Sequence, residues 1–211
     1  MTVIRLFRFV PVRPSFDHVL RTEMIPDLLA KPGLEDCYLG RQGPGEVGPR
    51  IVVSVWSTRE AMVEAIGDRL GVFHPEHLDD TTDQDLEILE LLVTHRDAYE
   101  DATILRLLRG RTRQGELRSY AADVRRSVGH DAELGHAPLA LYLADLVDDR
   151  FVTISAWREW ADIEWATGGD VRRPAATRRS ERLLEWAVDH YEIVGTATST
   201  PDRRPAPTEP G

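Results

Sequence analysis

The sequence of 211 residues predicts an α+β fold with two ferredoxin-like (β-α-β-β-α-β) units in tandem, which form an intrachain pseudo-dimeric αβ barrel. One observation is an internal repeat. Residues 3–8 (VIRLFR) recur as 104–109 (ILRLLR), and 51–56 (IVVSVW) recur as 152–157 (VTISAW), both at an offset of 101 residues. The other observation is that each half follows the same order of strand-like and helix-like patterns. We therefore read the chain as a tandem duplication.

In the first half, the expected strands are rich in branched and aromatic residues and are bounded by proline, glycine or turn residues. These strands are 2–10, 36–40, 50–56 and 86–93. Ser15 is the expected N-cap of an amphipathic helix that Pro26 kinks or splits and that stops at Pro32-Gly33. A second helix is expected over 58–70, and the sequence Gln42-Gly43-Pro44-Gly45 predicts a hairpin turn.

The second half repeats this order. Its expected strands are 102–109, 139–146, 150–157 and 190–196. One expected helix covers 116–128 and ends at Gly129, and the other covers 159–167. The domains are accordingly expected at 1–98 and 99–197, followed by a disordered tail over 198–211 that is rich in proline.

Composition narrows the class of protein. Hydrophobic residues make up 42% of the chain, which is enough for a core, and 36 acidic against 26 basic residues give a net charge of -10. This excess of negative charge argues against a nucleic-acid partner, because phosphate binding needs clustered positive charge. No apolar run is long enough to cross a bilayer, so no membrane association is expected. The lone Cys37 and the missing signal peptide favour a cytoplasmic location.

Several short motifs match this element order. They are Pro32-Gly33-Leu34 after the first helix, Val53-Ser54-Val55-Trp56 at a strand end, Ala61, and the segment Phe73-His74-Pro75-Glu76-His77. With them, residues 3–93 resemble the antibiotic biosynthesis monooxygenase family, and residues 104–195 keep the element order and the strand end Ile154-Ser155-Ala156-Trp157. The resemblance implies the dimeric αβ-barrel superfamily. In it, two sheets meet face to face, and a duplicated chain supplies both; further homo-oligomers of the pseudo-dimer remain open.

The resemblance also implies a chemistry. Oxygenases of this family deprotonate a phenolic or quinol-like aromatic, whose phenolate reduces O₂ without any cofactor or metal, and oxygen adds to a ring carbon to give a quinone. Such a site needs an apolar, aromatic-walled pocket, a base and groups that hold an anion. The residues expected to act in catalysis are Trp56, His74 and His77, and those expected to bind the small aromatic substrate are Arg5, Tyr38 and Trp157.

Alternatives stay open for most of these residues. Asn is absent from the chain, so haem degradation through an Asn, Trp and His set is disfavoured, although haem could still bind through His77. His74 and His77 are equally compatible with an exposed loop. The repeated arginines at positions 5, 8, 106 and 109 could instead pair with Glu90 or Glu192 on the last strands. A non-catalytic, ligand-binding or structural member of the superfamily is therefore the alternative to an oxygenase.

Overall fold

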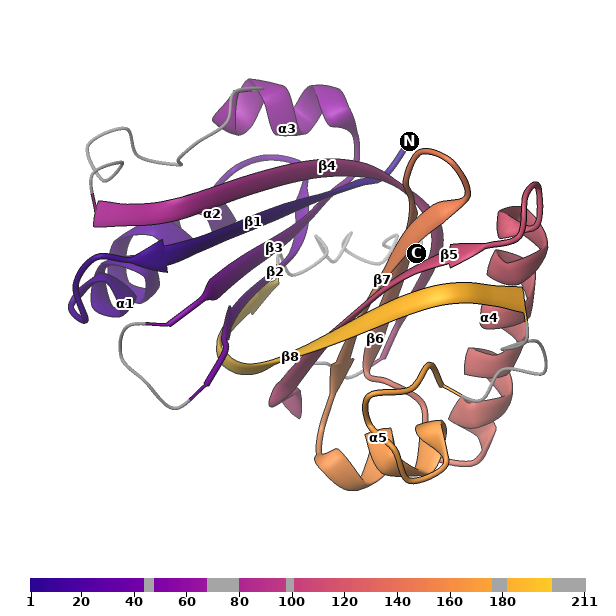
Figure 1. Cartoon of the computed structure of the whole chain (residues 1–211). Helices are drawn as coiled ribbons and strands as arrows, with labels where there is room; N and C mark the ends of the chain where they lie inside the picture. Colours follow the sequence, from indigo (N-terminus) through magenta and orange to yellow (C-terminus); the bar gives the residue numbers. More distant parts are fainter. Residues whose placement is uncertain (44–47, 68–79, 98–100, 176–181, 199–211) are drawn as a thin grey trace, which may run out of the picture.

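The computed structural model describes residues 1–43, 48–67, 80–97, 101–175 and 182–198. Within these residues, eight antiparallel strands form one closed barrel, and the helices lie outside it (Figure 1). The first half contributes β1 (Val3–Pro11), β2 (Leu34–Arg41), β3 (Arg50–Trp56) and β4 (Thr81–Arg96). The second half contributes β5 (Ile104–Thr112), β6 (Ala140–Asp145), β7 (Arg150–Trp157) and β8 (Leu183–Thr198).

The strand order confirms the predicted fold class. Around the barrel the order is β1-β3-β2-β8-β5-β7-β6-β4, so each half supplies four neighbouring strands in the same relative order. The halves meet at two joints, β2 with β8 and β6 with β4. The registers repeat as well, because Val3 pairs with Trp56 and Ile104 pairs with Trp157. The strand pairing therefore keeps the offset of 101 residues that the sequence shows.

The last strand of each half is longer than predicted. β4 and β8 each have 16 residues, whereas the sequence pattern marked only 86–93 and 190–196. The reason is that each strand serves two neighbours. β4 pairs with β1 along Thr81–Glu90 and with β6 along Glu90–Arg96. The sequence pattern of one repeat cannot show the strand of the other half with which β4 or β8 pairs across the joint.

The helical segment after β1 is interrupted, as Pro26 predicted. It consists of α1 (Phe16–Val19), the π-helical turn η1 (Leu20–Met24) and α2 (Ile25–Leu29). Pro26 has no N–H and its ring crowds the carbonyl four residues back, which explains the widened turn before it. Ser15 occupies the N-cap position, as predicted, although its side chain makes no capping hydrogen bond there.

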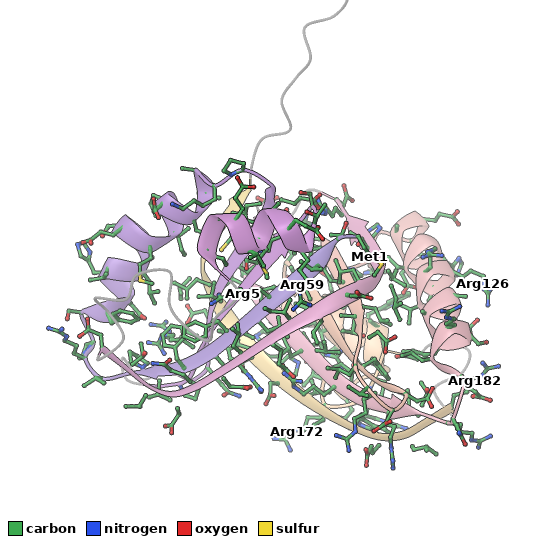
Figure 2. All side chains as sticks on the ribbon, turned by 90° about the horizontal axis from the view of Figure 1, so that it is seen from above. Met1, Arg5, Arg59, Arg126, Arg172 and Arg182 are labelled. Atoms are coloured by element: carbon green, nitrogen blue, oxygen red, sulfur yellow. The ribbon has the colours of Figure 1, made fainter. Side chains whose placement is uncertain are left out.

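The remaining helices are α3 (Arg59–Ile66), α4 (Leu117–Glu133) and α5 (Trp160–Thr167). α4 continues through Gly129, where a helix end was predicted, and stops before Gly135, whose φ is +77°. One glycine costs a helix only about 1 kcal/mol, which packing of the apolar face of α4 outweighs. Seen from above, α3 and α4 lie on opposite sides of the barrel, and Arg126 projects from α4 (Figure 2). None of the described helices is long and apolar enough to span a bilayer.

Side-chain alternation along the strands creates two kinds of core. Leu6 and Leu107 point into the barrel, where they pack with Tyr38, Tyr142 and other buried residues of both halves. The opposite face of the first half packs beneath α1, η1, α2 and α3. The outer face of the second half packs beneath α4 and α5. Each half thus has a layer between sheet and helices, and both share the barrel interior.

The arginines repeated on β1 and β5 divide between these layers. Arg5 and Arg8 lie on opposite faces of β1, as their spacing predicted. Inside the barrel, Arg8 pairs with Asp85. Arg109 Nη1 donates to Glu87 Oε1 at 3.0 Å, which links the two halves across the barrel. The partners predicted from sequence were therefore wrong.

Glu192, one of those predicted partners, pairs instead with Arg41 of β2. The predicted partner Glu90 faces Val3 across the β1–β4 ladder rather than either arginine of β1. The error has a simple cause: the partner of an inward-facing arginine depends on the register of β4 and on the opposite side of the barrel, and neither is visible in one strand's pattern.

Candidate functional site

The covered face of the first half carries an Arg, Ser and Trp set. Arg5 on β1 pairs in register with Ser54 on β3, and Trp56 follows two residues later on the same face. The Trp56 indole Nε1 donates to Ser54 Oγ at 3.0 Å. Trp56 is fully buried. The loop between α2 and β2 contains Gly33, whose φ is +83°. A Cβ at this position would come within 2.6 Å of Ala61 Cβ on α3.

Aromatic rings fill the space beside this first set. The Arg5 guanidinium lies over the Phe7 ring, 5.2 Å from its centroid, and Phe7 stacks on Phe9. Burial lowers the pKa of Arg5 to about 10, although the nearby Cys37 acts in the opposite direction. Burial also raises the pKa of the Cys37 thiol to about 12, so this cysteine stays protonated and is no nucleophile.

The second half repeats the set but leaves space beside it. Arg106 pairs in register with Ser155, and Trp157 Nε1 donates to Ser155 Oγ at 2.8 Å. At the positions of Phe7 and Phe9 the second half has Leu108 and Gly110. A cavity of about 50 Å³ lies between β5, β7 and α4. Its lining includes Arg106, Tyr120, Asp131, Thr153, Ser155 and Trp157.

Two polar atoms in the cavity lining lack a hydrogen-bond partner among the described residues. They are Arg106 Nε and Thr153 Oγ1. The arginine side chain is held by its other end, because Nη2 donates to the backbone oxygen of Arg173. Burial lowers the pKa of Arg106 to about 10, which still leaves the guanidinium charged at neutral pH. The cavity therefore presents a buried positive charge with an open donor.

Two further ionisable groups flank this cavity. Burial raises the pKa of Tyr120, so its phenol stays protonated and able to donate a hydrogen bond. Asp131, at the edge of the cavity, also has a raised pKa because it is partly desolvated.

His190 is a neighbour of Arg106 that sequence reasoning missed. It pairs with Arg106 across the β5–β8 ladder, and its ring centroid is 4.9 Å from that of Trp160. Burial, assisted by the charge of Arg106, lowers the pKa of His190 to about 4, so the imidazole is neutral at pH 7. Its Nε2 is buried without a partner among the described residues. The position on β4 that pairs with Arg5 is the apolar Ile88, so the strand register rather than a sequence motif distinguishes His190.

Tyr38, predicted to bind substrate with Arg5, lies on the other side of the sheet. It faces the barrel interior, where its hydroxyl is 3.2 Å from that of Tyr142. The Tyr142 hydroxyl donates to Asp36 Oδ2 at 2.6 Å, and Arg96 Nε is 3.0 Å from the same oxygen. The structure therefore separates Tyr38 from Arg5.

The two tryptophans predicted for the site are also apart. Trp56 and Trp157 end equivalent strands in different halves. His74 and His77, the predicted bases, lie outside the described residues. In the described part of the chain, no group of three or more His, Cys, Asp or Glu side chains could hold a metal ion. Of the predicted site residues that lie within the described ranges, only Trp157 lines the cavity described above.

Comparison with solved structures finds proteins with a similar fold. A candidate monooxygenase from Lactobacillus acidophilus superposes with a TM-score of 0.72 at 10% identity, covering 94% of this chain and 96% of the other. An anthrone oxidase-like protein gives 0.58 at 14% identity, with 94% and 93% covered. A ferredoxin-fold protein of Listeria monocytogenes related to antibiotic biosynthesis monooxygenases gives 0.53 at 10% identity, with 92% and 96% covered.

The chain shares the fold of these monooxygenase-like proteins. The fold expected from the sequence resemblance is thereby confirmed over nearly the whole length. At such low identity the likeness concerns the fold and not the site. No family model and no curated protein matches the sequence. The comparisons therefore do not identify the functional residues of this chain.

Proposed function

We propose that the chain is a cofactor-independent monooxygenase of a phenolic or quinol-like aromatic and that the second half holds the working site. The observation that carries this proposal is the cavity against Trp157, between the sheet and α4. The fold shared with an anthrone oxidase-like protein supports the reaction class. The stack of Phe7 on Phe9, at positions where the second half has Leu108 and Gly110, supports the choice of half.

The chemistry asks for a reducing substrate and O₂. The phenolate transfers an electron to O₂, and one oxygen atom bonds to the ring carbon that loses its hydrogens. That carbon becomes a carbonyl, and the second oxygen atom leaves with the two hydrogens as water. Trp157 would form the aromatic wall, and Tyr120 would donate to the developing anion. Neither role requires a metal or an organic cofactor.

Oxygen uptake tests this function. The dialysed, metal-free protein should accelerate the oxidation of an anthrone or a dihydroxynaphthoquinol in air, and ¹⁸O₂ should place one labelled atom in the quinone. Trp157→Phe should lower kcat/KM about tenfold, because an offset-stacked ring contact contributes about 1 kcal/mol and the smaller ring fits less well. No acceleration across such a panel would contradict the proposal.

Variants of the first half form the matched comparison. Trp56→Phe and the double variant His74→Ala/His77→Ala should keep the activity if the second half is the working site. Loss of activity in those variants, with Trp157→Phe active, would instead locate the reaction at the first-half residues that the sequence singled out.

A non-catalytic role that binds a ligand smaller than a polycyclic phenol is the second candidate, and the cavity volume favours it. About 50 Å³ is well below the roughly 300 Å³ or more of a pocket that encloses a drug-sized molecule. A binding protein would take up such a ligand without consuming O₂. Saturable binding by calorimetry, together with no oxygen uptake from the same ligand in reduced form, would establish this role and exclude the oxygenase.

A further inference from the structure

We infer that the second-half cavity is an anion site, in which Arg106 and Thr153 bind the negatively charged oxygen of an acidic aromatic ligand, a carboxylate or a phenolate. This inference deepens the proposed function, because it names the class of molecule that the same site would take. It does not depend on oxidation, since a carboxylate can bind without reacting.

The first reason is the pair of open donors. Arg106 Nε and Thr153 Oγ1 are buried, line the same cavity and have no partner among the described residues. The exposed fractions are 3% for Arg106 and 7% for Thr153, so bulk water does not satisfy them. A buried guanidinium without a carboxylate partner is costly, and an acceptor oxygen of the ligand would remove that cost.

The second reason is the comparison with Arg5. In the first half, the Phe7 ring lies beneath the guanidinium of Arg5. The second half has Leu108 in place of Phe7, so Arg106 lacks this ring, and the cavity lies beside it. A ligand that brings both a ring and an acid group would restore the cation–π contact and supply the missing counter-charge.

Thr153 separates the halves in the same way. Its equivalent in the first half is the buried Val52, which offers no hydroxyl. On β7, Thr153 and Ser155 point to the same face as Arg106. Ser155 Oγ accepts from Trp157, so its own hydroxyl hydrogen remains available for a ligand oxygen. The hydroxyl pair thus belongs only to the half that has the cavity.

The charges around the cavity are compatible with an anion. His190, beside Arg106, is neutral at pH 7 and does not compete for the ligand. Asp131 is the carboxylate in the lining, and burial raises its pKa. The volume of about 50 Å³ suits the acid group of the ligand.

Paired probes test the charge preference. Benzoate and its neutral analogue benzyl alcohol differ mainly in charge, and calorimetry on the full chain should show benzoate binding at least about tenfold more tightly, as expected for a charge-assisted hydrogen bond. Binding of 4-nitrophenolate at alkaline pH, followed by its absorbance, distinguishes phenolate from carboxylate recognition. Equal affinity for benzoate and benzyl alcohol would overturn the inference.

Variants locate the site. Arg106→Met should abolish the preference for benzoate, and Thr153→Val, which copies the first half with an isosteric side chain, should weaken benzoate binding about threefold to tenfold. Arg125→Met removes the same charge from the exposed face of α4 and should leave binding unchanged. If Arg106→Met does not fold, Thr153→Val decides. Loss of binding in Arg5→Met with retention in Thr153→Val would contradict the assignment.

The two proposals can fail separately. Benzoate binding that depends on Arg106, without any oxygen uptake, would uphold the anion site and remove the oxygenase. Oxygen uptake by an unmodified protein that binds benzoate and benzyl alcohol equally would uphold the oxygenase and remove the anion site.

Discussion

Gly110 and Phe151 show how the packing of equivalent positions differs between the halves. In the first half, Phe9 pairs with Arg50 across the ladder, and in the second half Gly110 pairs with Phe151. The Phe151 ring occupies the space over Gly110, where a Cβ would come within 2.6 Å of Cζ. The phenylalanine therefore lies on β1 in the first half and on β7 in the second half, so the packing between sheet and helices differs between the halves.

Gly110→Ala should therefore destabilise the fold. The added methyl group has no room, and overpacking of this kind costs about 1–3 kcal/mol. Gly129→Ala is the matched control, because a Cβ at that position of α4 meets nothing within 4 Å. It should stabilise the protein by about 0.8 kcal/mol through helix propensity. Urea unfolding of both variants measures the difference, and equal midpoints would refute this account of Gly110.

His190 predicts a pH dependence. Its folded-state pKa of about 4 is below the usual 6.5, so as pH falls from 6.5 towards 4 the unfolded chain takes up a proton that the folded chain does not. Falling pH in this window should therefore lower the free energy of unfolding. The loss should be smaller in His190→Gln, and urea titrations at pH 7 and pH 5 give the comparison. Identical losses in both proteins would show that His190 titrates normally.

Some site residues could be found from the sequence and others could not. The repeated Trp56 and Trp157 stand out because the offset aligns them. Tyr38 was grouped with Arg5 because the register between β1 and β2, which sets the face of each side chain, depends on β3 between them. His190 has no motif around it, and only its three-dimensional neighbour Arg106 gives it significance.

At the scale of elements, the ion pair between α1 and β3 fixes the first helical segment. Arg50 is fully buried, and its Nε and Nη2 donate to the two carboxylate oxygens of Asp17 at 2.8 and 2.9 Å. The second half has Phe151 in place of Arg50, so apolar packing holds its first helix, α4, against the sheet. A buried arginine that loses its partner keeps the cost of desolvation.

Asp17→Ala should thus cost about 3 kcal/mol of stability. Asp27→Ala, which removes the exposed i,i+4 partner of Lys31 in the same helical segment, should cost no more than about 0.5 kcal/mol. Thermal unfolding of the two variants separates a buried pair from a surface pair. A similar small effect in both would mean that the Asp17–Arg50 pair does not hold α1.

Local patterns identified β3 and β7 with their observed bounds, because both are short, buried and bounded by turns. The failures were at long elements. α4 passes through a glycine, and β4 and β8 run on into the other half. In each case tertiary packing, which lies beyond a local window, outweighs the local stop signal.

For the whole molecule, the barrel makes the two halves depend on each other. The joints β2–β8 and β6–β4 close the sheet, and the interior core draws residues from both halves. A half alone would expose two sheet edges and the apolar face that the other half covers. We therefore expect the predicted domain bounds, 1–98 and 99–197, to mark repeats rather than independent folding units.

Separate expression of 1–98 and 99–211 tests this dependence. Each fragment alone should dimerise or aggregate, and the two mixed together should restore one complex with the far-UV dichroism of the intact chain. Sedimentation velocity gives the masses. A monodisperse, folded monomer of 1–98 would show that the barrel is not needed for its stability.

The pair of tyrosines inside the barrel has a consequence for the symmetry of the chain. Tyr38 and Tyr142 occupy equivalent ladder positions, opposite Val53 and Ile154, and their hydroxyls meet. In a dimer of identical subunits, such a contact would be one residue touching its own copy across a twofold axis. Here Asp36 accepts a hydrogen bond from Tyr142, while its counterpart is Ala140. A single chain whose two halves differ permits such a one-sided arrangement, since a dimer of identical subunits would carry both carboxylates or neither.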